Sequence, residues 1–152
     1  MEKIGPIILI DDDMEDLETY KLAFDSLHLK NEILLFQSAE VALAYLKISI
    51  DPCFFILCDI NMPKMNGIEL RAELNKENFL SLKSIPFLFF STSSHISHIF
   101  SAYNSSIQGY FQKPTDFKDI QLMFKTIVSY WGSSLIPVPS YFAENPYPKN
   151  VR

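Results

Sequence analysis

The sequence predicts an α/β protein built on a doubly wound, five-stranded parallel sheet. Five short apolar runs alternate along the chain with segments of helical periodicity. Within each run the apolar residues are consecutive, whereas a half-exposed antiparallel strand would alternate apolar and polar residues. Strands that are apolar on both faces are typical of a parallel sheet that helices cover on both sides. A (βα)5 alternation joins such strands by right-handed crossovers.

Each predicted strand is followed by a predicted helix. The strands are expected at Ile7–Ile10, Ile33–Phe36, Phe54–Cys58, Phe87–Phe90 and Gly109–Phe111. The helices are expected at Leu17–Leu27, Ala39–Lys47, Gly67–Lys76, Ile96–Tyr103 and Phe117–Trp131, where apolar residues recur at helical spacing. Ser38 has the side chain of an N-cap and directly precedes the second helix.

Length and composition restrict the protein to one folded domain. The chain has 152 residues, and we expect the domain to span residues 1–132. With 48% hydrophobic and 20% charged residues, disorder of the whole chain is excluded. The formal net charge of −5 is opposite to the balance of proteins that neutralise nucleic-acid phosphates, so we expect no binding to nucleic acid.

Residues 133–152 have a composition of their own. The segment 132–134, Gly-Ser-Ser, ends the last predicted helix, and prolines follow at positions 137, 139, 146 and 148. This density of proline favours extended backbone. The same segment carries more apolar side chains than a flexible linker usually does. We therefore expect a proline-rich extension that docks on its own domain or takes part in a dimer.

The chain shows no sign of a membrane span or a secretion signal. Its apolar runs are far shorter than the ~20 residues that cross a bilayer. The N-terminal run is interrupted by Pro6 and ends in aspartates, without a small-residue cleavage site. Cys53 and Cys58 are five residues apart, which would place them on opposite faces of a strand as buried, unpaired thiols. We expect a cytoplasmic protein with no membrane partner.

Polar residues capable of chemistry follow four of the predicted strands. The first strand leads into residues 11–13, Asp-Asp-Asp, and the third into Asp59. The fourth leads into Ser91, and the fifth into Lys113. Because the carboxyl ends of parallel strands meet at one edge of the sheet, these side chains are expected to share one cleft.

The expected cleft is suited to a phosphoryl group. Several carboxylates within a few ångströms repel one another unless a cation joins them, and Mg²⁺ with oxygen ligands meets this need. A lysine and a hydroxyl add the donors that phosphoryl oxygens require. Asp59 ends the buried third strand and is the best candidate for a nucleophile that forms an aspartyl phosphate.

These residues resemble the receiver domain of two-component response regulators, as in the chemotaxis regulator. The matching segments are the acidic group after Ile7–Ile10, residues 59–67 (DINMPKMNG), residues 85–91 (IPFLFFS) and residues 109–114 (GYFQKP). They occur in the order and spacing of the family over about residues 5 to 131. The resemblance implies a flavodoxin-like fold with strand order 2-1-3-4-5.

The resemblance also assigns the metal site and the phosphoacceptor. Asp59 matches the phosphoacceptor, and Asp11 with Asp12 matches the acidic pair that holds Mg²⁺. Asn61 would offer its backbone carbonyl to the same ion. Asp12 and Asp13 also satisfy the acidic pattern, and we favour Asp11 and Asp12 because Asp13 can cap the first helix.

The remaining matches concern phosphoryl contact and switching. Ser91 resembles the hydroxyl that bonds the phosphoryl group, where many relatives have threonine, and Lys113 resembles the phosphate-contacting lysine. The bond from Lys113 to Pro114 is usually cis in this family. Tyr110 matches the aromatic switch that turns inward when the hydroxyl moves. Asn61 and Ser93 would flank the path of the water that removes the phosphoryl group.

The resemblance therefore implies a single-domain response regulator and not an enzyme. A sensor histidine kinase or a histidine phosphotransfer protein would phosphorylate Asp59, and the output would be binding to a downstream protein or to a second copy. Two alternatives stay open. One is a receiver fold that binds partners without phosphorylation. The other is a haloacid-dehalogenase-type phosphatase, which would need an aspartate where Asn61 stands.

Overall fold

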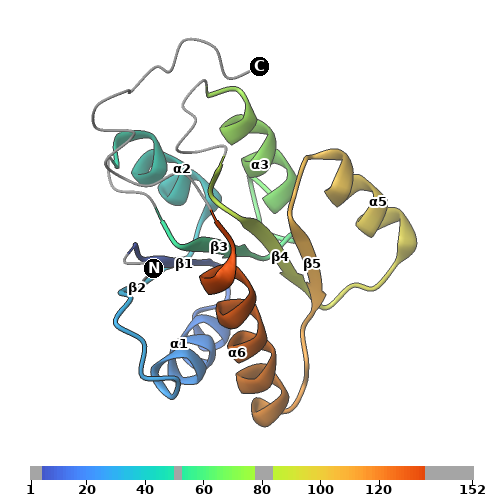
Figure 1. Cartoon of the computed structure of the whole chain (residues 1–152). Coiled ribbons are helices and arrows are strands. Elements are labelled where there is room, and N and C mark those ends of the chain that lie inside the picture. The colour runs from blue at the N-terminus through green and yellow to red at the C-terminus, as the bar shows by residue number, and fades with distance from the viewer. Residues whose placement is uncertain (1–4, 50–52, 78–83, 136–152) are drawn as a thin grey trace.

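The computed structural model describes residues 5–49, 53–77 and 84–135, which form a parallel sheet between two layers of helices (Figure 1). The strands are β1 (Ile7–Ile10), β2 (Ile33–Phe36), β3 (Phe55–Cys58), β4 (Phe87–Ser91) and β5 (Gly109–Gln112). The helices are α1 (Met14–Asp25), α2 (Ala39–Ile48), α3 (Gly67–Asn75), α5 (Ile96–Asn104) and α6 (Phe117–Ser133). All strand pairs are parallel, and the order β2-β1-β3-β4-β5 confirms the expected topology.

The two faces of the sheet bury separate sets of side chains. One face packs against α1 and α6 through alternate strand residues such as Leu9, Leu57 and Phe90. The other face packs against α2, α3 and α5 through the intervening residues, such as Ile56 and Phe89. Figure 1 shows the same division, with α1 and α6 on one side of the sheet and α2 and α3 on the other. The consecutive apolar residues of each strand therefore fill both layers of the core.

Aromatic rings join α1 and α6 beneath the sheet. Phe24 of α1 stacks on Phe124 of α6 with ring centroids 4.1 Å apart, and both side chains are fully buried. Tyr20 meets the edge of Phe90 from β4 at 5.0 Å. Each buried aromatic side chain contributes on the order of 2–3 kcal/mol through burial, so this cluster fixes the two helices against each other and against the central strands.

Side-chain caps define where the helices begin. The Asp13 carboxylate accepts hydrogen bonds from the backbone N–H groups of Glu15 and Asp16, which confirms it as the N-cap of α1. Ser38 caps α2 as expected. Asn66 and Glu69 form a capping box at the start of α3, and this ends the loop that follows β3.

The cysteines are buried and unpaired as predicted, but for a different reason. Cys53 and Cys58 both lie in the core layer under α2, α3 and α5. Cys53 precedes β3, and Phe54 and Phe55 both turn to the opposite layer, so the alternation of a strand does not hold there. The expectation that the two thiols lie on opposite faces was wrong. Burial raises the pKa of the Cys53 thiol to about 12.

Within the described residues, none of the helices is both long enough and apolar enough to cross a bilayer. The α6 helix ends at Ser133, close to the expected boundary at residue 132. The proline-rich extension was predicted for residues 133–152. Ser133 belongs to α6, and residues 136–152 lie outside the described residues.

Candidate functional site

The expected cleft forms at the carboxyl edge of the sheet, where the strand hydrogen bonds continue into the site residues. The Asp59 N–H donates to the Ile10 carbonyl at 2.8 Å, and the Lys113 N–H donates to the Ser91 carbonyl at 2.8 Å. The backbone of Asp59 is therefore held by β1, and that of Lys113 by β4. The hydrogen bonds between neighbouring parallel strands therefore fix the backbone positions from which both side chains extend.

Three carboxylates converge at this edge. Oxygen atoms of Asp11, Asp12 and Asp59 all lie within 4.8 Å of one another. Asp11 is buried, Asp59 is half-buried and Asp12 is exposed, so the group opens to solvent on one side. We call Asp11, Asp12, Asp59 and Lys113 the acid edge.

Lys113 follows β5 and reaches the three carboxylates although it lies 102 residues after Asp11 in the sequence. Its Nζ lies 2.8 Å from Asp11 Oδ2, 3.3 Å from Asp16 Oδ2 and 3.5 Å from Asp59 Oδ2. The ammonium also lies over the ring of Tyr20, 5.7 Å from its centroid. One buried ammonium is therefore shared among three carboxylates, and in this arrangement its shortest contact is to Asp11 and not to Asp59.

The titration of these groups reflects burial as well as charge. Burial raises the pKa of the Asp59 carboxyl to about 6, and the neighbouring Asp11 charge adds to this while Lys113 opposes it. Burial also raises the pKa of Asp11 in spite of its hydrogen bond with Lys113. For Lys113, burial alone would lower the pKa of the ammonium, but the hydrogen bond and charge of Asp11 raise it above the ordinary value.

The donor set fits a hard divalent cation. Lys113 supplies a single positive charge to a group of three converging carboxylates, so its charge does not balance all of them. Mg²⁺ is bound through one or two carboxylates together with waters and phosphate oxygens, which this open group of oxygens allows. Asn61 lies in the exposed part of the loop after β3, and its carbonyl stays a predicted ligand.

Two carboxylates of the acid edge, those of Asp11 and Asp59, are oriented by backbone N–H groups. Asp11 Oδ1 accepts from the Asp13 N–H at 3.0 Å, and Asp59 Oδ1 accepts from the Ile60 N–H at 2.8 Å. Asp13 itself is used as the cap of α1. The structure therefore brings Asp11, Asp12 and Asp59 together and directs Asp13 to the helix instead.

The loop that carries Asp59 passes close under Gly67. A Cβ atom at this glycine would meet the Asp59 carbonyl oxygen at 2.4 Å and the Phe89 ring at 2.7 Å. The Gly67 N–H donates to the Ile60 carbonyl at 2.9 Å. Glycine is thus needed here for the close approach of α3 to the residue that presents the carboxylate.

Ser91 and Tyr110 lie beside the acid edge and are linked through Ser93. The Ser91 side chain is fully buried at the end of β4, and its Oγ accepts from the Ser93 N–H at 3.3 Å. The Tyr110 hydroxyl donates to the Ser93 carbonyl at 2.6 Å, and its ring packs against Phe89. The Tyr110 ring is therefore turned toward the protein. The bond from Lys113 to Pro114 is trans, unlike the cis bond that the resemblance implied.

Two residues of the site were not predicted from the sequence. Asp16 shares Lys113 with the acid edge, and Tyr20 lies beneath the ammonium. Both stand on α1, in the first two turns after Asp13. The acidic first turn of a helix is a common feature that the helix dipole favours, so Asp16 gave no distinct signal.

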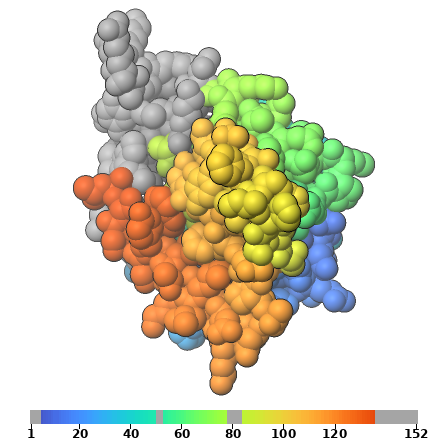
Figure 2. Space-filling model, turned by 90° about the vertical axis from the view of Figure 1, so that its right-hand side faces the viewer, coloured from blue at the N-terminus to red at the C-terminus, as the bar shows by residue number. Residues whose placement is uncertain are grey.

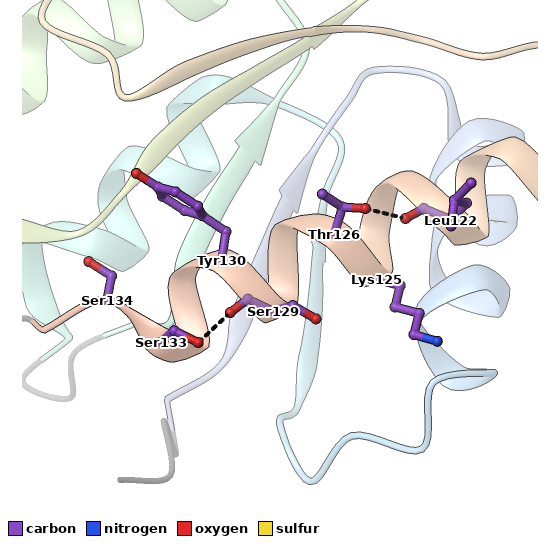
Figure 3. Close-up of a pocket in the computed structure, with 7 residues that line it drawn as sticks. All are labelled: Leu122, Lys125, Thr126, Ser129, Tyr130, Ser133 and Ser134. Atoms are coloured by element: carbon purple, nitrogen blue, oxygen red, sulfur yellow. Dashed lines mark hydrogen bonds between the residues drawn. The ribbon is translucent and has the colours of Figure 1, made fainter.

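A larger surface hollow lies elsewhere and lacks converging polar groups. It has a volume of about 780 Å³ and is lined by Leu122, Lys125, Thr126, Ser129, Tyr130, Ser133 and Ser134. Figure 3 shows that these residues come from α6 and its end, with the Thr126 and Ser133 hydroxyls bonded back to their own helix. A hollow that is lined by one helix and its end, without converging polar groups, carries no catalytic argument.

Figure 2 looks onto the side of the molecule formed by α5, β5 and α6. On α5, the side chains of Ile96, Phe100 and Tyr103 are more than half exposed. This agrees with an apolar surface on the helix next to Tyr110.

The sequence model described as the response regulator receiver domain matches residues 7–125. Among curated proteins, the chain is 26% identical over 141 residues to the probable methanogenesis regulatory protein FilR2 of Methanothrix harundinacea, and the match covers 88% of each chain. It is 27% identical over 131 residues to the response regulator Rcp1 of Synechocystis, which covers 82% of this chain and 87% of Rcp1.

Solved structures show the same similarity in three dimensions. The phosphorylated cyanobacterial phytochrome response regulator RcpA superposes with a TM-score of 0.80 at 26% identity, covering 90% of this chain and all of RcpA. The Mn²⁺-bound form of Rcp1 superposes with a TM-score of 0.74 at 25% identity, covering 88% of this chain and 99% of Rcp1.

Proposed function

The chain belongs to the response regulator receiver domain family, and from this membership we propose that it is a switch controlled by phosphorylation of Asp59. Proteins of this family are signalling proteins of two-component systems and are typically phosphorylated on aspartate. The observation that carries the assignment is the position of Asp59 at the end of β3, with its Oδ2 atom 3.5 Å from the Lys113 ammonium. The family assignment does not favour the phosphatase alternative.

In the proposed reaction, a carboxylate oxygen of Asp59 attacks the phosphorus of a phosphohistidine on a sensor kinase or a phosphotransfer protein. The new O–P bond forms as the P–N bond breaks, and the donor imidazole leaves and takes up a proton. Lys113 is positioned to donate hydrogen bonds to the transferred oxygens, because Asp59 and Lys113 already share this edge.

Mg²⁺, held by Asp11, Asp12 and Asp59 with the Asn61 carbonyl, would neutralise charge on the transferred phosphoryl group. The donor set described above supports this, and the relative Rcp1 has been solved in a Mn²⁺-bound form. Asp11 keeps its orientation through the Asp13 N–H. The Asp59 oxygen bonded by the Ile60 N–H is likewise fixed in direction.

The proposed output is a change of surface near Ser91 and Tyr110 that a partner protein reads. The Ser91 hydroxyl would donate to a phosphoryl oxygen, and the Ser93 link would carry this change to Tyr110. We propose that the partners are a histidine kinase or a phosphotransfer protein and a downstream target, in the cytoplasm. Receiver folds that act without phosphorylation are the competing possibility, and the following experiment separates the two.

The test is to incubate the protein with acetyl phosphate and Mg²⁺ and to measure intact mass. We expect a gain of one phosphoryl group that disappears in Asp59→Asn and persists in Asp25→Asn, since Asp25 lies on α1 in an exposed pair with Lys21. Beryllofluoride should bind only to proteins with Asp59 intact. A wild-type protein that gains no mass and binds no beryllofluoride would overturn the proposal.

The choice of metal ligands has a separate test. We propose Asp12 rather than Asp13 as the partner of Asp11, because Asp13 caps α1. Asp12→Asn should weaken Mn²⁺ binding at least tenfold, whereas Asp13→Asn should leave it within about twofold, because asparagine caps a helix as well as aspartate does. If Asp13→Asn weakened Mn²⁺ binding more than Asp12→Asn, the metal ligand would be Asp13 and not Asp12.

The domain boundary is proposed at residue 132, with residues 133–152 as a docking or dimerisation extension. A chain that ends at residue 135 should keep its ability to bind beryllofluoride, because the family match ends at residue 125. Its oligomeric state by light scattering should differ from that of the full chain. An unchanged oligomeric state and an unchanged melting temperature would count against a role for the extension in docking.

A further inference from the structure

Ser93, in the loop between β4 and α5, is the centre of a second polar network. Its N–H donates to Ser91 Oγ at 3.3 Å, and its carbonyl accepts from the Tyr110 hydroxyl at 2.6 Å. Its own hydroxyl lies 2.7 Å from Nδ1 of His98 on α5. We call these four residues the Ser93 network. One residue thus joins β4, β5 and α5 through three separate groups.

The Ser93 hydroxyl makes two hydrogen bonds at once. Its Oγ accepts from the His95 N–H at 3.3 Å and is also bonded to His98 Nδ1, with the direction of the second bond set by the tautomer of the ring. His98 stands in the first turn of α5, so the bond ties the loop to a helix and not to another flexible segment.

Besides the Ser93 network, a longer hydrogen bond holds this loop, from the Gln112 side-chain amide to the Thr92 carbonyl at 3.4 Å. Thr92, Ser94 and His95 are exposed, and Ser93 is half-buried. Residues 92–112 contain no Lys, Arg, Asp or Glu, so no side-chain ion pair involving those residue types can orient the segment. In an exposed loop with few packing contacts, a short hydrogen bond to a helix restricts the backbone more than it would in a packed core.

We propose that His98 is a positioning residue that holds Ser93 where its carbonyl receives the Tyr110 hydroxyl, so that the ring of the aromatic switch is held inward. This inference rests on the proposed function, because the inward ring matters only if Asp59 is phosphorylated. The Tyr110 ring packs on Phe89, and its hydroxyl donates to the Ser93 carbonyl. A network that favours the inward ring lowers the free energy needed to reach a phosphorylated state with the same ring position.

The experiment compares three variants of the full chain. His98→Leu removes the ring nitrogen that bonds to Ser93 and leaves a side chain that cannot form a hydrogen bond. His98→Asn places a hydrogen-bonding atom the same number of bonds from Cα as Nδ1 and should restore the contact. His95→Asn is the matched control, because it changes the neighbouring imidazole while keeping the backbone N–H and a side chain that caps α5.

The first measurement is made on unmodified protein without a phosphoryl donor. Tyrosines are replaced by fluorotyrosine, and the ¹⁹F resonance of Tyr110 is assigned from its loss in Tyr110→Phe. We expect the resonance to shift or broaden in His98→Leu and to return to the wild-type position in His98→Asn. An unchanged resonance in His98→Leu, or equal behaviour of the leucine and asparagine variants, would overturn the inference.

The second measurement is the affinity for beryllofluoride in Mg²⁺. His98→Leu should weaken binding by about two- to fivefold, the effect of one exposed hydrogen bond, with His98→Asn and His95→Asn close to wild type. Unchanged affinity together with a shifted Tyr110 resonance would overturn the coupling of His98 to phosphorylation. If wild-type protein binds no beryllofluoride, the proposed function fails, while the Tyr110 resonance still decides whether His98 positions the loop.

Discussion

The acid edge and the Ser93 network lie side by side at the carboxyl ends of the strands, but they are held by different forces. In the acid edge, one buried ammonium is shared among Asp11, Asp16 and Asp59, and burial raises the pKa values of Asp11 and Asp59. The Ser93 network is built from hydroxyl, carbonyl and imidazole groups in a stretch without Lys, Arg, Asp or Glu.

Under the proposed function, the acid edge would bind the cation and the phosphoryl group, and the Ser93 network would transmit the resulting change. Charged groups respond strongly to a divalent cation or a phosphoryl group, because the interaction energy of charges is large where water is excluded. Neutral hydrogen bonds are short-ranged and respond to geometry alone. The two regions meet at Ser91, which ends β4 beside the acid edge and accepts from Ser93. The following predictions test whether the two regions are energetically distinct, from the largest expected effect to the smallest.

Removing the shared cation should have the largest effect on stability. Lys113→Met leaves Asp11 and Asp59 buried without a counter-ion, and we expect a loss of about 3 kcal/mol in the free energy of unfolding at pH 7.5 without metal. Urea titration measures this loss. The loss should shrink at pH 4.5, where the carboxyls with raised pKa values become protonated.

The matched control is Lys21→Met, which breaks an exposed pair with Asp25. It should change stability by no more than about 0.5 kcal/mol. Equal losses in Lys113→Met and Lys21→Met would mean that the acid edge is an ordinary surface ion pair.

Gly67→Ala tests the close packing of α3 against the Asp59 backbone and the Phe89 ring, which lie next to both regions. The added methyl group would meet the Asp59 carbonyl oxygen and the Phe89 ring, and Phe89 packs against Tyr110. We expect a destabilisation of about 2–3 kcal/mol in thermal or urea unfolding, because backbone must move to make room. Gly132→Ala in α6 is the control: its nearest neighbour would be Phe54 at 4.0 Å, and it should stabilise the helix by up to about 1 kcal/mol. If Gly67→Ala left the free energy of unfolding unchanged, this would contradict the close approach of α3 to the residue that follows β3.

Removing the charge of Asp59 should stabilise the metal-free protein. The pKa of this carboxyl is raised from 3.8 to about 6 in the folded state, so folding favours its protonated form. The stability that this proton provides is present below pH 4 and is lost as the pH rises through 6. Asp59→Asn should therefore be more stable than wild type by about 2 kcal/mol at pH 7.5 in the presence of a chelator, and by much less near pH 4.

The measurement is urea unfolding over pH 4–8. Adding Mg²⁺ should reduce the advantage of Asp59→Asn at pH 7.5, because the cation stabilises only the protein that retains the carboxylate. If the stability difference between Asp59→Asn and wild type did not vary with pH, the fold would not disfavour the charged form of Asp59.

The Ser93 network should show the smallest effect and the weakest dependence on conditions. Tyr110→Phe removes one half-buried hydrogen bond of 2.6 Å and should cost about 1 kcal/mol in unfolding free energy. Because the lost bond joins a hydroxyl to a carbonyl, the loss should vary with pH and salt far less than the loss in Lys113→Met. A loss that follows pH as in Lys113→Met would show that the two regions are one electrostatic unit.

Much of the fold could be predicted from local pattern. The five strands and five helices that were expected are all present, and the strand order follows the resemblance. The position of Asp59 after a buried strand and of Lys113 after the last strand was enough to place both at one edge, since parallel strands point the same way. Asp13 and Ser38 were recognisable as caps because capping depends on a few adjacent residues.

Other features depend on pairings that no local pattern records. Cys53 shares a core layer with Cys58 because the chain departs from strand alternation at Phe54. Arg71 is another such case: it is buried, lies over the Phe87 ring at 5.2 Å, and donates two hydrogen bonds to the Ser106 carbonyl, 35 residues away. From the sequence it reads as an ordinary solvent-facing residue of α3.

The sequence by itself determined which residues stand at the strand ends, because hydrophobic periodicity and turn position are properties of neighbouring residues. Only the tertiary structure decided which of them touch. Lys113 bonds to Asp11 across 102 residues of sequence and also to Asp16. Asp13 instead caps α1. Ser93 binds His98 and Tyr110 at once because the crossover of α5 returns β5 beside β4. Such contacts are set by how whole elements pack, and that packing is a property of the complete chain.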